Sequence, residues 1–119
     1  MSFQNQFTKT TTDANLMETV HHGSAEYPFR YYYENIALFD FKCIDWHWHS
    51  ELEFIYIESG NVVFDIGTVH FELNEGNGIM INSKILHRLQ SSSDAIIPNF
   101  LFQPSFIAPQ DSLIYKKYI

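Results

Sequence analysis

The sequence has one cysteine, few basic residues and no long apolar run. The single cysteine, Cys43, excludes an internal disulfide framework and a zinc site made of cysteines. Seven Lys and Arg against fourteen Asp and Glu give a formal net charge of −7, which disfavours direct binding of these residues to nucleic acid. No apolar run approaches the roughly 18 residues of a membrane span, and residues 1–12 lack the apolar stretch of a signal peptide. We therefore expect a cytoplasmic protein that does not contact a membrane.

The apolar residues that are present suffice for one folded domain. Hydrophobic residues make up 45% of the 119 residues and aromatics 17%, which excludes disorder along the whole chain. From Tyr27 onward, short β-branched and aromatic stretches are separated by turn signals at intervals of about 8–12 residues. This pattern predicts about six to nine strands in an all-β sandwich or barrel. The stretches are 31–33, 36–39, 53–57, 62–64, 69–73, 79–81, 87–89 and 99–102.

Three segments are expected along the chain. Residues 1–25 carry no period-2 pattern and are interpreted as an N-terminal arm over the main body, in which Asp13 caps a short helix. Leu16, Met17 and Val20 would lie on one side of that helix. Residues 26–110 form the barrel. Residues 111–119 are expected to begin a C-terminal helix or a linker.

The segment from His47 to Glu53 carries the strongest chemical pattern. Side chains alternate along an extended chain, so His47, His49 and Glu53 share one face, which becomes apolar further along. Buried imidazole and carboxylate groups require partners, because an unsatisfied one costs several kcal/mol. A divalent first-row metal, a polar ligand or ordered water would satisfy them. Glu51 shares this face as well, but we expect a bulge near Ser50 to turn it toward solvent.

Two spaced motifs resemble those of the cupin superfamily. The pattern His47-x-His49-x-x-x-Glu53-x6-Gly60 has the spacing of the first cupin motif, and residues 76–87 have the spacing of the second. The resemblance implies a cupin-type double-stranded jelly-roll barrel. In cupins that bind metal, the ligand positions would hold Zn(II), Ni(II), Mn(II) or Fe(II), and the alternative is a polar lining without metal. The matching positions here are His47, His49, Glu53 and His87.

Further stretches resemble the sensor half of AraC-type transcription regulators. The resemblance implies that the barrel binds a small polar effector such as a sugar, and that later helices form a homodimer. It also implies that a C-terminal helix-turn-helix domain binds DNA, and that the effector acts by ordering the arm or an outer face. The dimer helices and the DNA-binding half are not in this sequence, so we expect a fragment of a longer regulator. The stretches are Tyr27-Pro28-Phe29, His47-Trp48-His49, Ile81-Asn82 and the ending from Ser112 to Ile119.

The candidate effector-binding residues are the four cupin positions together with Tyr31 and Asn99. Tyr31 is expected to point into the barrel, and Asn99 places an amide among apolar neighbours. Trp46 and Trp48 have the opposite parity from the histidines and should face outward, where another segment must cover them. No catalytic residue is assigned, because the resemblance implies a sensor. The alternative is a stand-alone metal-dependent cupin enzyme of the dioxygenase or isomerase type.

Overall fold

The structure is a computed structural model that describes residues 9–19 and 29–107, and most of its regular structure is β-strand. Two short 3-10 segments, η1 (Ile36–Leu38) and η2 (Asp40–Lys42), lie between the first two strands. A four-residue helix, α1 (Pro104–Ile107), follows the last strand. The strands are β1 (Phe29–Asn35), β2 (Cys43–His47), β3 (Leu52–Tyr56), β4 (Asn61–Ile66), β5 (Val69–Asn74), β6 (Gly78–Ile81), β7 (His87–Gln90) and β8 (Ile96–Phe102).

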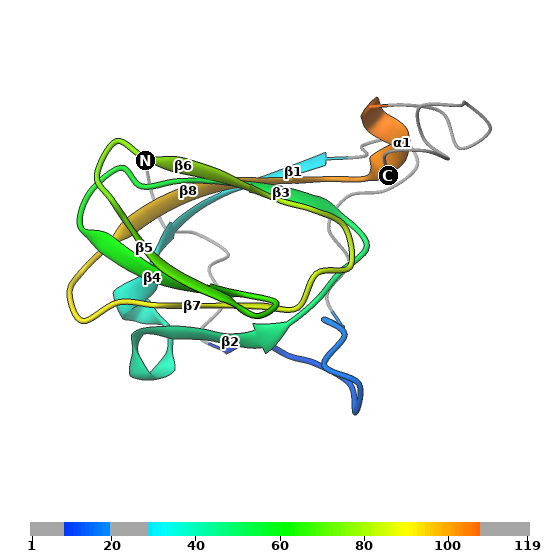
Figure 1. Ribbon diagram of the computed structural model, residues 1–119, viewed down its shortest axis with the longest axis horizontal. Coiled ribbons are helices and arrows are strands. Elements are labelled where there is room, and N and C mark those ends of the chain that lie inside the picture. Colours follow the sequence, from blue (N-terminus) through cyan, green and yellow to red (C-terminus); the bar gives the residue numbers. More distant parts are fainter. Residues whose placement is uncertain (1–8, 20–28, 108–119) are drawn as a thin grey trace.

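The strands form two antiparallel four-stranded sheets that face each other (Figure 1). One sheet has the order β1-β8-β3-β6 and the other β2-β7-β4-β5, so most neighbours in a sheet are distant in sequence. Glu53 of β3, for example, lies opposite Ile81 of β6 on one side and Leu101 of β8 on the other. This strand order is that of a jelly roll, and it confirms the predicted all-β cupin-type barrel.

The apolar core lies between the two sheets and adjoins the polar residues that gather near one end of the barrel. Val62 and Phe64 of β4 are fully buried and alternate with the partly exposed Val63, as expected for a strand with one buried face. Along β3 the buried face changes from Glu53 to the apolar Ile55. The polar residues of β3 are therefore followed along the strand by apolar residues of the core. The core cluster consists of Ile36, Ile55, Ile57, Val62, Phe64, Ile81, Leu89, Ala95 and Ile97.

The strand predicted over residues 36–39 is wrong, because these residues form η1 and the turn into η2. The Asn35 side chain accepts a hydrogen bond from the backbone N–H of Ala37 at 3.0 Å and so begins a tight turn. Phe41 (φ 60°) and Lys42 (φ 50°) continue the reversal in the left-handed region. Local bonding between side chain and backbone thus outweighs the β propensity of this apolar stretch.

Residues 9–19, the part of the expected arm that the structure describes, lie against the barrel beside the segment that follows β2 (Figure 1). They do not form the helix predicted from Asp13. Instead, Asp13 Oδ1 accepts hydrogen bonds from the N–H groups of Asn15 (2.8 Å) and Met17 (3.0 Å) and closes a loop. The prediction fails because an aspartate can satisfy the same backbone donors in a loop as at a helix cap.

The described residues do not include every predicted element. The helix expected over residues 111–119 lies outside them, as does Val20 of the arm. Within the described ranges, no helix is long and apolar enough to cross a membrane.

Gly60→Ala is expected to destabilise the domain by about 2 kcal/mol. Gly60 has φ +82°, and a Cβ atom there would lie 2.8 Å from the Asp94 carbonyl oxygen and 3.0 Å from Ala95 Cα. Gly67→Ala is the matched control, because Gly67 also has a positive φ (+58°) but nothing lies within 4 Å of its Cβ position. The control should lose only about 1 kcal/mol. Urea unfolding measures both losses, and equal losses would contradict the role given to the close contact.

Candidate metal and effector site

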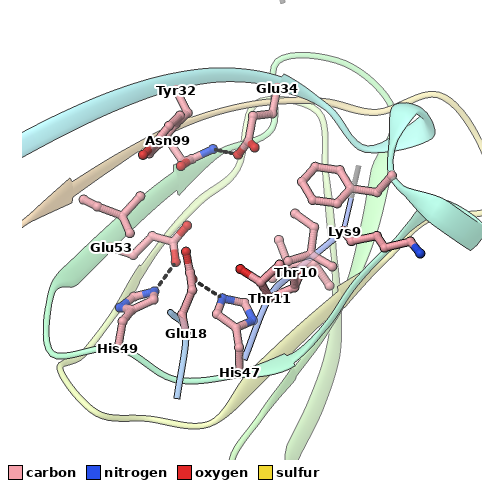
Figure 2. Close-up of a pocket in the computed structure, with 14 residues that line it drawn as sticks. Lys9, Thr10, Thr11, Glu18, Tyr32, Glu34, His47, His49, Glu53 and Asn99 are labelled. Atoms are coloured by element: carbon pink, nitrogen blue, oxygen red, sulfur yellow. Dashed lines mark hydrogen bonds and ion pairs between the residues drawn. The ribbon is translucent and has the colours of Figure 1, made fainter. Parts of the chain in front are cut away.

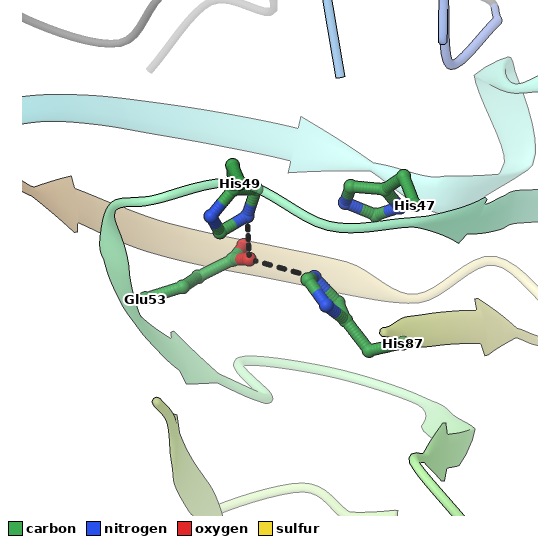
Figure 3. Close-up of side chains that lie close together, drawn as sticks. All are labelled: His47, His49, Glu53 and His87. Carbon is green, nitrogen blue, oxygen red and sulfur yellow. Dashed lines mark hydrogen bonds and ion pairs between the residues drawn. The ribbon is translucent and has the colours of Figure 1, made fainter. Parts of the chain in front are cut away.

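Three histidines and one glutamate meet at one end of the barrel (Figure 3). His47 ends β2, His49 lies between β2 and β3, Glu53 belongs to β3, and His87 begins β7. One ligand atom of each residue lies within 4.8 Å of the others, and all four side chains are buried. The structure therefore brings together, from both sheets, the full set of residues that the sequence indicated as metal ligands.

Backbone carbonyl groups fix the orientation of the three rings. Each Nδ1–H donates a hydrogen bond to a carbonyl two residues away, which leaves Nε2 of each ring facing the centre of the cluster. The bonds run from His47, His49 and His87 to the carbonyl oxygens of Asp45, Glu51 and Ile85, over 2.7, 3.0 and 2.7 Å respectively.

The Glu53 carboxylate is the common partner of two rings. Its Oε1 atom lies 3.2 Å from Nε2 of His49 and 3.2 Å from Nε2 of His87 (Figure 3). A neutral ring that already donates from Nδ1 has only a lone pair at Nε2, and two facing lone pairs repel. Each contact therefore requires a proton on the ring or a cation between the ring and the carboxylate.

The pKa values of His49, His47 and Glu53 differ from the ordinary values of these side chains. Burial opposes a charge on His49, but the hydrogen bond and charge of Glu53 outweigh burial and raise the pKa of His49 to about 9. Burial, together with the neighbouring His87, lowers the pKa of His47 to about 4. Burial also opposes the charge on Glu53, but its bonds to the two rings hold its pKa well below the ordinary value. At neutral pH an ionised carboxylate thus lies beside a neutral His47.

The donor set fits a divalent first-row metal. Three imidazole nitrogens and a carboxylate oxygen suit Zn(II), Ni(II), Mn(II) and Fe(II). Ligands about 2.1 Å from one ion lie about 3.0–3.4 Å from their neighbours in octahedral or tetrahedral geometry. The two contacts of Glu53 measure 3.2 Å and fall in that range.

A pocket extends from this cluster toward β1 and β8 (Figure 2). Asn99, a predicted effector-binding residue, lies on its wall and is 2% exposed. Its Nδ2 atom donates to Glu34 Oε1 at 2.7 Å and to the Ile97 carbonyl at 2.9 Å. A molecule in the pocket would therefore meet both a polar wall and the His/Glu cluster. The lining residues are Lys9, Thr10, Thr11, Glu18, Tyr32, Glu34, Phe39, Ile44, His47, His49, Glu53, Leu89, Asn99 and Leu101.

The structure corrects the orientation expected for Tyr31. Tyr32 and Glu34 line the pocket, whereas Tyr31 packs against the half-exposed Phe100 with ring centroids 4.7 Å apart. Burial raises the pKa of Tyr32 to about 12, so its hydroxyl group keeps its proton at neutral pH. In a run of three tyrosines, a period of two cannot select the buried face, because both faces carry the same side chain.

Glu51 is also placed differently from the prediction. It is buried instead of exposed, with Oε1 4.0 Å from Nδ1 of His49. Glu51, Leu52 and Glu53 are buried in succession, so Glu51 does not turn outward to solvent. Its carboxylate lies on the side of His49 that faces away from Glu53, and we do not include it among the metal ligands.

Residues 9–19 contribute four residues to the pocket wall, Lys9, Thr10, Thr11 and Glu18, and sequence reasoning placed none of them in the site. Glu18 Oε2 lies 3.5 Å from Nε2 of His47 (Figure 2). Thr10 Oγ1 is buried on the pocket wall and has no hydrogen-bond partner among the described residues. Nothing in the spacing of the arm sequence signals either contact, because both depend on how the arm docks on the barrel.

The two tryptophans are covered by other parts of the chain, as their outward parity requires. The backbone N–H of Trp48 donates to the Leu16 carbonyl at 3.0 Å, and its Nε1–H donates to the Asn15 carbonyl at 2.9 Å. Trp46 lies beneath the Arg88 guanidinium, 4.8 Å from the ring centre. Trp48 is therefore part of the contact between arm and barrel.

Comparisons with known proteins agree with this geometry. Residues 39–108 match the family model of the AraC-like ligand binding domain. The chain is 32% identical over 109 residues to the uncharacterized HTH-type transcriptional regulator YdeC of Bacillus subtilis (strain 168), a match that covers 90% of this chain and 37% of that protein. An RmlC-like cupin from Shewanella frigidimarina has a TM-score of 0.57 at 14% identity, covering 63% of this chain and 66% of that chain. A cupin-2 domain containing protein from the same organism has a TM-score of 0.56 at 13% identity, covering 64% and 72%.

Proposed function

Because the chain belongs to the family of AraC-like ligand-binding domains, we propose that it senses a small polar effector for a transcription regulator. The similarity to an HTH-type regulator supports this context, and the chain spans 37% of that protein's length. In the longer protein, further helices form a homodimer and a helix-turn-helix domain binds DNA. Effector binding in the barrel changes the dimer geometry and hence the DNA affinity, a coupling typically worth about 1–3 kcal/mol.

The observation that carries this proposal is the set of polar groups on the pocket wall. Thr10 Oγ1 is a buried hydroxyl without a partner among the described residues, and leaving such a group unsatisfied costs about 1–3 kcal/mol. Carboxylates of Glu18 and Glu34 offer acceptors on the same wall. Hydroxyl groups of a sugar or another polyol can donate to these acceptors and accept from Thr10, which makes such a molecule the effector class we favour.

Thr10→Val is expected to leave the stability of the domain unchanged or slightly higher, and to weaken effector binding about tenfold. The substitution keeps the shape of the side chain and removes the unpartnered hydroxyl. Melting temperatures measured with a panel of sugars, polyols and amino acids identify ligands of the parent, and the shift should shrink in the variant. Thr68→Val is the control, because Thr68 is exposed in the turn after β4. A shift that survives Thr10→Val unchanged would place effector binding elsewhere.

We further propose that His47, His49, Glu53 and His87 hold a divalent metal at the base of the pocket. The contacts of Glu53 with the two rings support this, because a single cation can take the place of the proton that each contact otherwise requires. A bound metal supplies a Lewis acid beside the pocket. The three carbonyl-bonded rings position their Nε2 atoms for it. A metal-free polar lining remains the alternative.

A stand-alone metal-dependent cupin enzyme is the second candidate function. The observation that favours it is the complete four-ligand cluster at the edge of a pocket. The two candidates differ in what chelation should do. Removing the metal from an enzyme abolishes turnover, whereas a sensor keeps its fold and responds to effector with a higher melting temperature.

A further inference from the structure

Glu18 brings a second carboxylate to the His/Glu cluster. Its Oε2 atom lies 3.5 Å from Nε2 of His47, and the side chains of Glu18 and His47 are 11% and 5% exposed (Figure 2). Nδ1 of His47 is already bonded to the Asp45 carbonyl. The contact with Glu18 therefore uses the nitrogen that His47 would offer to a metal ion.

Backbone hydrogen bonds hold Glu18 in this position. Its N–H donates to the Trp48 carbonyl at 2.8 Å, and the N–H of Trp48 donates to the Leu16 carbonyl at 3.0 Å. Trp48 is the residue between His47 and His49. The arm is thus paired with the same short segment that carries two of the four ligands, and the pairing sets the direction of the Glu18 side chain.

We propose that Glu18 is a fifth ligand of the metal centre, supplied by the arm, so that metal binding fastens residues 9–19 across the pocket. This inference rests on the metal site of the proposed function. The spacing of 3.5 Å from Nε2 of His47 is close to the about 3.0–3.4 Å between neighbouring ligands of one ion, and Glu18 lies outside the four-residue group whose ligand atoms are all within 4.8 Å of one another. It is also close to the 3.2 Å of the two Glu53 contacts.

The net charge of the metal centre gives a second, independent reason to include Glu18 among its ligands. Three neutral imidazoles and the Glu53 carboxylate leave a divalent ion with one uncompensated positive charge in a buried site. A buried net charge is unfavourable, and the Glu18 carboxylate cancels it. A divalent ion bound by the barrel ligands alone therefore forms a positively charged centre, and the addition of Glu18 from the arm makes the centre neutral.

Metal affinity and docking of the arm are thermodynamically linked, and each can be measured separately. If contact with Glu18 raises metal affinity by some factor, then metal must raise the ratio of docked to undocked arm by that same factor. Removal of the carboxylate should weaken metal binding about 10- to 100-fold. Exchange of the amides that join the arm to Trp48 should slow on metal addition by a similar factor.

The test combines Ni²⁺ titration by calorimetry with amide hydrogen exchange at Glu18 and Trp48, whose N–H groups form the arm–barrel pair. Glu18→Gln keeps the size of the side chain and removes its charge. Glu75→Gln is the matched control, because it removes the same charge from an exposed turn between β5 and β6. Glu18→Asp keeps a carboxylate on a shorter side chain and should have an intermediate affinity for Ni²⁺. In every variant, exchange of the Trp48 amide reports whether the arm is docked.

We expect Glu18→Gln to bind Ni²⁺ about 10- to 100-fold more weakly than the parent and to show no slowing of Trp48 exchange on Ni²⁺ addition. Glu75→Gln should match the parent in both measurements. If Glu18→Gln binds Ni²⁺ as tightly as the parent, the role of Glu18 is overturned while the metal centre stands. If the parent binds no Ni²⁺, the metal centre is overturned, and the inference with it.

Discussion

His87→Ala should bind Zn²⁺, Ni²⁺ or Mn²⁺ at least about 100-fold more weakly than the parent domain. His87 is completely buried at the start of β7, and its Nε2 atom contacts Glu53 Oε1. The substitution removes one ligand and one of the two partners that orient the carboxylate. Elemental analysis of the purified protein and calorimetric titration give the stoichiometry and the affinity.

Metal should also stabilise the parent strongly and the variant hardly at all. An ion present at 100 times its dissociation constant adds about 2.7 kcal/mol to the unfolding free energy, which corresponds to a melting-temperature rise of roughly 10–20 °C for a domain of this size. His70→Ala is the control, because the His70 side chain is 68% exposed and outside the four-residue cluster. Undiminished binding by His87→Ala would exclude this residue from the metal site, and a parent without metal would favour the metal-free lining.

Without metal, the domain is expected to be most stable near pH 6.5, with losses of roughly 3 kcal/mol on each side of the maximum. The pKa of buried His47 falls from its ordinary 6.5 to about 4. Between these values the unfolded chain binds a proton that the folded domain does not, so stability rises with pH over this window. The pKa of His49 is raised to about 9, so its contribution is fully present below pH 6.5 and is lost as pH rises to 9.

Urea unfolding in the presence of a chelator, followed between pH 4 and pH 9, measures the unfolding free energy on both sides of this maximum. The rise in stability from pH 4 to pH 6.5 is the acid limb of the profile, and the loss from pH 6.5 to pH 9 is its alkaline limb. His47→Gln should flatten the acid limb alone, and His49→Gln should flatten the alkaline limb alone. Thr68→Val changes an exposed residue that does not titrate and should leave the profile unaltered. If the acid limb persists in His47→Gln, its cause is not the burial of neutral His47.

The fold and the centre of the site followed closely from local patterns in the sequence. The spacing from His47 to Gly60 predicted which residues share a buried face, because side chains alternate along any extended segment. An all-β sandwich or barrel followed from short apolar stretches between turns, and the resemblance to the cupin motifs selected the barrel. Where two choices fitted the pattern equally well, as in Tyr31, Tyr32 and Tyr33, the period gave no answer. Local hydrogen bonds decided the conformation at Asn35 and Asp13, and propensity alone had favoured a strand and a helix there.

The sequence by itself determined the all-β class, the motif spacing and the shared face of His47, His49 and Glu53, because these features depend on short-range alternation and on the identity of each side chain. The jelly-roll barrel and the role of His87 came from the resemblance to the cupin motifs. Only the tertiary structure decided that Glu18 and Thr10 belong to the pocket, that Tyr32 faces it in place of Tyr31, and that Glu51 is buried. These placements depend on how the arm docks on the barrel and how β1 pairs with β8, and such long-range contacts have no periodic signal in the chain.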